Sequence, residues 1–187
     1  MKDYDGTEYP DDSVESSADF AAIPDGFRRL WTPHRIAYIE QGPTPSGDTC
    51  VFCTAPSLSD EEALIVHRGE LGYVILNLFP YNSGHLLVVP YRHVAMYVDA
   101  TSEETAEIAA LTQTAMRALS ATSRCDGFNL GMNQGAVAGA GIAAHLHQHV
   151  VPRWSGDANF LPIVAQTKAL PKLLGEVRAE LASAWPA

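Results

Sequence analysis

The sequence of 187 residues has little positive charge, few cysteines and no long apolar run. Its 12 Lys and Arg are outnumbered by 22 Asp and Glu, which gives a formal net charge of −10. We therefore expect no broad basic surface and no binding of polymeric nucleic acid. Three cysteines are too few for a disulfide framework. Because no apolar run is long enough to cross a bilayer, we also expect no membrane partner.

Other missing features indicate where the protein is located and how many domains it has. Residues 1–5 show neither the basic nor the apolar region of a signal peptide, so we expect a cytoplasmic protein. No internal repeat or second domain is visible, and the length suits one domain. Residues 1–25 are acidic and poor in large aliphatic side chains, which predicts a disordered tail. Residues 26–187 are predicted to form a single domain.

The most informative stretch is 144–152, where three histidines stand at alternate positions. In an extended strand, His145, His147 and His149 leave the backbone on one side, whereas Leu146 and Val150 point to the other. Histidine is neither a favoured strand former nor a cheap core residue. We therefore interpret the row as a catalytic or metal-binding array. The alternative is a half-buried strand that happens to carry histidines.

The rest of the chain predicts a mixture of strands and helices. Residues 72–79 and 85–90 are rich in β-branched and aromatic residues and flank a turn at 80–84, which predicts a β-hairpin. A long amphipathic helix is expected to begin with Ser102 as its cap and to run to about Ser120. The other predicted elements are strands at 35–39 and 126–133, a short helix within 58–68 and a C-terminal helix at 170–184.

Three further patterns could carry chemistry. Cys50 and Cys53 form a CxxC, which indicates half a metal site first and redox chemistry second, with two small buried thiols as the alternative. Asn77 is a polar residue in an apolar strand, where it could cap a bulge or bind a ligand hydroxyl. The glycine-rich loop 134–144 lets backbone N–H groups approach an anion.

Several imidazoles on one strand face fit two kinds of chemistry. One is a three-histidine zinc site with an open position for water. The other is phosphoryl or nucleotidyl transfer through a histidine nucleophile. The glycine-rich loop directly before the histidines favours the second kind, because its N–H groups are suited to developing charge on phosphate oxygens.

The run 145–151 resembles the His-φ-His-φ-His-φ-φ signature of the histidine triad (HIT) family, where φ is apolar, with Gln148 replacing one apolar residue. Asn77, Pro80 and Gly84-His85 resemble the family's hairpin motif. The flanks 30–35 and 152–160 resemble its actinobacterial diadenosine tetraphosphate phosphorylase branch. The resemblance implies an α+β, HIT-like fold: a mainly antiparallel sheet of about five strands with one long and one C-terminal helix.

The resemblance also implies roles for the candidate residues. His147 is the expected nucleophile, His149 the partner of the α-phosphate and leaving group, His145 the residue that orients the row, and His85 its support. Nucleotide or phosphate contacts are expected at six positions: Asn77, Asn133, Gly139, Ala140, Gly141 and Ile142. Many family members carry Gln, Ser or Thr just before the triad, but residues 139–144 contain none. Backbone N–H groups are the expected substitutes.

The implied reaction forms a covalent nucleotidyl-histidine. Inorganic phosphate then releases ADP, so that diadenosine tetraphosphate gives ADP and ATP; water as acceptor would give AMP and ATP. A divalent ion such as Mg²⁺ is expected with the polyphosphate. Alternative functions are a dinucleoside polyphosphate hydrolase, a nucleoside phosphoramidase and a nucleotide-binding sensor without turnover.

The resemblance further implies a structural zinc ion and self-association. The expected zinc ligands are Cys50, Cys53, His93 and His145, a closed Cys₂His₂ set. A homodimer through the long helix and a sheet edge is expected, or a tetramer. Gln148 lies on the face opposite to the histidines and is assigned, as a hypothesis, to a subunit contact.

Overall fold

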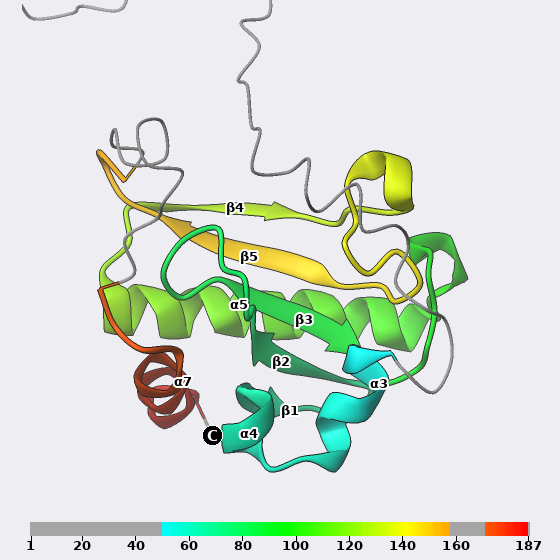
Figure 1. The fold of residues 1–187 in the computed structure, drawn as a ribbon, viewed down its shortest axis with the longest axis horizontal. Coiled ribbons are helices and arrows are strands. Elements are labelled where there is room, and N and C mark those ends of the chain that lie inside the picture. Colours follow the sequence, from blue (N-terminus) through cyan, green and yellow to red (C-terminus); the bar gives the residue numbers. More distant parts are fainter. Residues whose placement is uncertain (1–49, 158–170, 187) are drawn as a thin grey trace, which may run out of the picture. The chain divides into compact units, whose positions relative to one another are not determined.

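The computed structural model describes residues 50–157 and 171–186. Their centre is one antiparallel sheet with the strand order β1-β2-β3-β5-β4 (Figure 1). The strands are β1 (Ile65–Arg68), β2 (Gly72–Leu76), β3 (Leu86–Pro90), β4 (Gly127–Gly131) and β5 (Gln148–Arg153). The predicted α+β arrangement with five strands is thereby confirmed. The predicted tail and the strand at 35–39 lie outside the described residues.

Helices lie on both sides of this sheet. They are α3 (Val51–Thr54), α4 (Asp60–Ala63), α5 (Ser102–Ser123) and α7 (Leu174–Ser183), with short 3₁₀ turns η2 (Ala55–Ser57), η3 (Tyr97–Asp99) and η4 (Ala136–Ala138). The long helix and the C-terminal helix are both confirmed. In Figure 1, α5 runs behind the sheet and α3 stands in front of it. In the described ranges no helix is long and apolar enough to cross a membrane.

The two faces of the sheet bury different clusters. On the α5 side, strand residues such as Val74 and Val88 pack against Ile108 and Leu119 of α5 and Leu181 of α7. On the α3 side, the smaller cluster joins Phe52 to strand residues that include Tyr73, Ile75 and Leu87. Leu87 pairs with His149 across β3 and β5. Directly paired residues share a face, so His149 lies on the α3 side.

The predicted short helix within 58–68 is present as α4, and the same stretch also holds β1, which the sequence did not indicate. Ser59 caps α4 by accepting the N–H of Glu62, whose carboxylate accepts the N–H of Ser59 in return. Leu64 then adopts a left-handed conformation with φ 60° and ends the helix after one turn. Ile65 and Val66 begin β1, an edge strand, and bury their β-branched side chains on opposite faces of the sheet.

The cap of α5 is Thr101 and not the predicted Ser102. Thr101 has an extended backbone, so its hydroxyl accepts the N–H of Glu104 while the Glu104 carboxylate accepts the N–H of Thr101. Ser102 is already the first helical residue. The buried Glu104 carboxylate also accepts two hydrogen bonds from Arg92. The start of α5 therefore anchors the segment that carries His93.

Candidate active site

The structure brings the three histidines together on the α3 side of the sheet. The residues are 1%, 5% and 9% exposed for His145, His147 and His149, and the rings of the last two meet edge to face with centroids 4.9 Å apart. Leu146 and Val150 join the core on the α5 side, so the predicted alternation is present. The expected strand 144–152 begins only at Gln148, because the N–H of Leu146 donates to Val94 and leaves the ladder.

His147 carries its proton on Nδ1. This nitrogen lies 2.8 Å from the backbone oxygen of His145, which can only accept a hydrogen bond. The neutral ring therefore has its lone pair on Nε2. Burial lowers the pKa of His147, so the ring stays neutral at neutral pH. A neutral imidazole with a fixed lone pair is the form that a nucleophile requires.

His149 carries its proton on the other nitrogen, and two neighbours determine this. The backbone N–H of Tyr81 donates to Nδ1 of His85, 3.0 Å away, so neutral His85 holds its proton on Nε2. That Nε2 lies 2.9 Å from Nδ1 of His149 and donates to it. The proton of neutral His149 is therefore on Nε2. Burial, followed by the nearby His147, lowers the pKa of His149 to about 4.

The Nε2 atom of His149 has an unusual position. It is buried and has no hydrogen-bond partner in the part of the chain that the structure describes. A buried donor without a partner costs free energy, and a catalytic role is one of the established explanations for such a group in a native structure. The site thus places a lone pair on His147 next to an N–H donor on His149.

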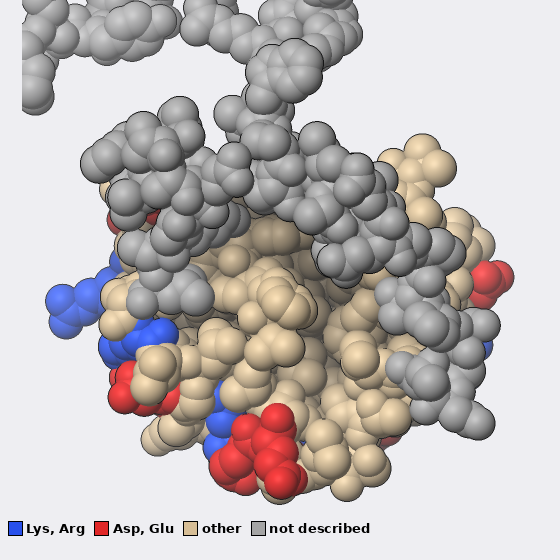
Figure 2. All heavy atoms as spheres, in the orientation of Figure 1, with Lys and Arg blue, Asp and Glu red and all other residues tan. Residues whose placement is uncertain are grey.

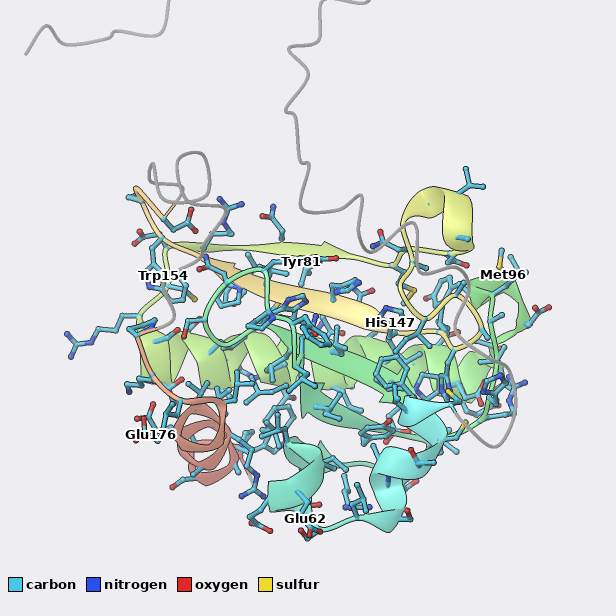
Figure 3. The ribbon with its side chains drawn as sticks, viewed as in Figure 1. Glu62, Tyr81, Met96, His147, Trp154 and Glu176 are labelled. Atoms are coloured by element: carbon cyan, nitrogen blue, oxygen red, sulfur yellow. The ribbon has the colours of Figure 1, made fainter. Side chains whose placement is uncertain are left out.

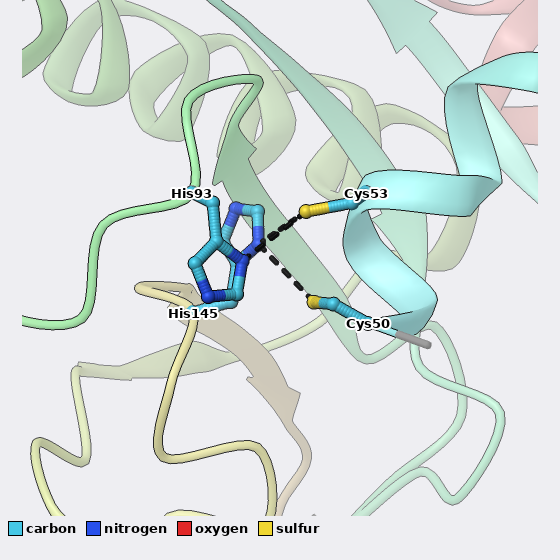
Figure 4. A group of neighbouring side chains, drawn as sticks. All are labelled: Cys50, Cys53, His93 and His145. Carbon is cyan, nitrogen blue, oxygen red and sulfur yellow. Dashed lines mark hydrogen bonds between the residues drawn. The ribbon is translucent and has the colours of Figure 1, made fainter. Parts of the chain in front are cut away.

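The first histidine has a different set of neighbours. Nε2 of His145 donates to the backbone oxygen of Pro90 at 2.9 Å, which leaves the lone pair on Nδ1. That Nδ1 lies 3.4 Å from Sγ of Cys50 and 3.5 Å from Sγ of Cys53, while Nδ1 of His93 lies 3.2 Å from Sγ of Cys53. The four ligand atoms lie within 4.8 Å of one another. Figure 4 shows the four side chains converging on one point.

This group fits a tetrahedral zinc ion. Bond lengths of 2.3 Å to sulfur and about 2.05 Å to nitrogen place tetrahedral sulfur and nitrogen ligands about 3.6 Å apart. The observed sulfur–nitrogen distances of 3.2–3.5 Å are close to this value. A zinc-bound histidine usually donates its other ring N–H to a carboxylate, a backbone carbonyl or water, which orients the ring. The backbone oxygen of Pro90 is such an acceptor for His145. Burial and the neighbouring Cys50 raise the pKa of the Cys53 thiol, so a thiolate there needs a cation to stabilise it.

Among the predicted nucleotide-binding residues described next, one contacts the histidines directly. The side chain of Asn77 lies just beyond β2, where Oδ1 accepts the N–H of Phe79 and Nδ2 lies 3.3 Å from Nδ1 of His85. Asn133 follows β4 and is half-buried. In the glycine-rich loop, the N–H groups of Gly139 and Ala140 donate to backbone oxygens of the same loop. Asn77 therefore supports His85 directly, which the sequence did not indicate.

Two aromatic residues of the site were missed in the sequence. Phe52, between the two cysteines, packs its ring 5.5 Å from that of His145 and 5.1 Å from that of His147. Tyr81, in the hairpin turn, stacks on His149 at 5.6 Å with an interplanar angle of 20°. Figure 3 shows Tyr81 and His147 on the same side of the sheet. The position of Phe52 between the two cysteines was the one feature of the sequence that could have indicated its role in the site.

Gln148 has a role within one chain. Its Nε2 donates to the backbone oxygens of Gly131, at the end of β4, and of His149. It thereby ties the start of β5 to the edge strand. An apolar residue, which the family signature places here, cannot make these bonds.

Charged side chains lie at the margins of the visible face in Figure 2. Among residues 50–157 and 171–186, no Lys or Arg bonds to a triad histidine; Arg92 and Arg153, for example, pair with Glu104 and Asp157. Within these residues, the Nε2–H group of His149 is a donor beside His147 that an anion could use. Such groups bind phosphate locally without a basic patch.

Comparison with known proteins assigns the class. The model of the HIT domain family matches residues 59–156, and this segment contains the hairpin and the triad. The match covers more than half of the chain, and the chain belongs to the HIT family. Three similar proteins refine this result.

The AP-4-A phosphorylase of Mycobacterium tuberculosis is 48% identical over 167 residues, which cover 86% of each chain. The crystal structure of a Zn-bound histidine triad family protein from Mycobacterium smegmatis is 30% identical and superposes with a TM-score of 0.60, covering 73% of this chain and 93% of the other. The crystal structure of a hypothetical histidine triad nucleotide-binding protein from Sulfolobus tokodaii is 26% identical, with a TM-score of 0.59 over 72% and 91% of the two chains.

Proposed function

We propose that this protein is a nucleotidyl transferase that cleaves diadenosine tetraphosphate with inorganic phosphate to give ADP and ATP. The relative named AP-4-A phosphorylase, at 48% identity, supports the substrate. The observation that carries the chemistry is the pair of opposite tautomers on His147 and His149. The proposed catalytic domain spans residues 26–187.

The first step uses the lone pair of His147. Nε2 attacks the α-phosphorus, a nitrogen–phosphorus bond forms, and the bond to the oxygen of the leaving ATP breaks. The imidazole becomes cationic, with its proton on Nδ1, and the backbone oxygen of His145 stabilises this charge by accepting that proton's hydrogen bond. The Nε2–H of His149 donates to the α-phosphate and to the oxygen of the leaving group.

The second step releases the nucleotide. An oxygen of inorganic phosphate attacks the same phosphorus, and the bond to Nε2 of His147 breaks, which gives ADP and restores the lone pair. Water in place of phosphate would give AMP. His85 is a positioning residue in both steps, because it contacts His149 and keeps the proton of that ring on Nε2.

Nucleotide contacts are proposed around these rings. The Oδ1 atom of Asn77 accepts one hydrogen bond within the turn and has a second lone pair for a ribose hydroxyl. Asn133 and the loop 139–142 are proposed to bind phosphate. The N–H groups of Gly139 and Ala140 close turns inside that loop, which shapes the backbone that the phosphate would approach.

A structural zinc ion is proposed at Cys50, Cys53, His93 and His145. With four protein ligands the ion would have no open position, so it would tie α3 to the start of β5 and take no part in the chemistry. A divalent ion such as Mg²⁺ is proposed to accompany the polyphosphate. A cytoplasmic location is proposed, where nucleotides and inorganic phosphate are both available.

A homodimer, or a tetramer built from it, is proposed through the edge strand β4 and helix α5. In the described ranges no strand pairs with the outer edge of β4, and Leu130 on it is 49% exposed. A groove beside it is lined by Gln113, Met116, Arg117, Ser120, Ala121 and Phe128. A second copy that pairs its own β4 would cover both features.

The test is incubation with diadenosine tetraphosphate, with and without inorganic phosphate, followed by separation of ADP from AMP. We expect ADP that forms only with phosphate. AMP formed equally well without phosphate would replace phosphorolysis by hydrolysis. Nucleotide binding without any turnover would indicate a sensor.

A further inference from the structure

The residue between the two cysteines connects the Cys₂His₂ group to the nucleophile. Phe52 belongs to α3 and stands between the exposed Val51 and Cys53, with Cys50 two positions before it. Its ring contacts the ring of His145, which belongs to the group, and the ring of His147, which does not. Phe52 therefore touches both sites at once.

His145 makes a second connection between the same two sites. Its side chain lies among the cysteines, and its backbone oxygen accepts the Nδ1–H of His147. A displacement of His145 would change both the ligand set and the hydrogen bond that fixes the lone pair of His147. The two connections run in parallel from the metal group to one imidazole.

Within residues 50–157 and 171–186, a small set of contacts holds the helix α3 in place. It contains four residues, and a helix of that length is not stable alone. It is held by the buried hydrogen bond from the Tyr73 hydroxyl to the backbone oxygen of Phe52, by apolar packing, and by the sulfur–nitrogen contacts of the two cysteines. Zinc would replace these weak contacts with bonds and so fix the position of Phe52.

We propose that Phe52 is a positioning residue that couples zinc binding at Cys50, Cys53, His93 and His145 to nucleotide binding at His147. This inference rests on the proposed function and on the proposed zinc site. Coupling between two sites is reciprocal: if zinc holds the wall of the nucleotide site in place, a bound nucleotide holds the zinc more tightly.

The test measures zinc release and not activity. The zinc-loaded protein is mixed with excess chromogenic chelator, with and without AMP, and AMP binding is measured separately by calorimetry. We expect AMP to slow zinc release from the unaltered protein about fivefold or more. In Phe52→Ala, one zinc ion per chain should remain and AMP should still bind, but the effect of AMP on release should fall below about twofold.

Val51→Ala is the matched control, because Val51 lies between the same cysteines and is half exposed. It should behave as the unaltered protein does. If Phe52→Ala loses zinc during purification, Phe52→Leu replaces it, and a reduced AMP effect is expected there too.

Three results would overturn the coupling. They are AMP binding that leaves zinc release unchanged, a full AMP effect in the Phe52 variant, and purified protein without zinc. Failure of the proposed function is a separate outcome: a protein that binds AMP but does not cleave diadenosine tetraphosphate would refute the function, and the zinc-release comparison would still decide the coupling. A protein that does not bind AMP would refute both.

Discussion

Two series of contacts in the active site, which we call its arms, each fix the tautomer of one histidine ring. The two rings end up with opposite tautomers. In the arm that begins at the cysteines, His147 donates its Nδ1–H to a backbone oxygen and keeps a lone pair on Nε2. In the arm that begins at the hairpin, a backbone N–H donates to His85, which donates to His149 and leaves an N–H on Nε2. The comparison teaches that the backbone group at the end of each arm decides whether an imidazole attacks or donates.

The largest expected effect comes from removing the attacking ring. His147→Ala deletes the Nε2 lone pair that attacks phosphorus, so we expect turnover of diadenosine tetraphosphate to fall by about 10³-fold or more, while the fold is kept. Mass spectrometry of the quenched reaction should show the nucleotidyl adduct on the unaltered protein and none on the variant. A variant that kept the original rate would refute the assignment of the nucleophile.

A smaller effect should follow from reversing the direction of the hydrogen bond between His85 and His149. In His85→Glu, the ionised carboxylate only accepts hydrogen bonds, so His149 should move its proton to Nδ1 and lose the donor on Nε2. Loss of one donor to a developing charge costs about 10²-fold in kcat. His85→Gln is the matched control, because its amide N–H can still donate to His149, and it should keep most of the activity. Equal losses in both variants would show that His85 acts by packing alone.

The smallest expected effect concerns stability and pH. The pKa of His149 is about 4 in the folded protein and near 6.5 in the unfolded chain, so the unfolded chain binds the proton first as pH falls. Stability should therefore be lost between pH 6.5 and 4, by about 3 kcal/mol from this residue. Urea unfolding at pH 7 and at pH 4.5 measures the loss. His149→Gln should reduce the difference between the two pH values, and an unreduced difference would contradict the origin assigned to it.

The local parts of this fold could be predicted from the sequence. The alternation of His145, His147 and His149 with apolar residues and the hairpin before them depend on short-range patterns, and both are present in the structure. The strand β1 was missed because a one-turn helix and a strand share the stretch 58–68, separated only by the left-handed Leu64.

The protonation pattern could not be predicted from the sequence. It depends on which backbone group lies beside each ring, and residues far apart in the chain supply those groups: Pro90 for His145, and Tyr81 for His149 through His85. The contact of Phe52 with His147 is likewise tertiary. The residue types in the metal group were expected from the family resemblance, but their mutual distances come only from the fold.

The central claim is that His147 and His149 are opposite tautomers. Long-range nitrogen–proton NMR of the ¹⁵N-histidine-labelled protein at pH 7.5 tests it directly, since protonated and unprotonated ring nitrogens have distinct shifts. We predict a proton on Nδ1 of His147 and on Nε2 of His149, with both rings neutral. The same tautomer on both rings, or a cationic ring at either position, would contradict the account.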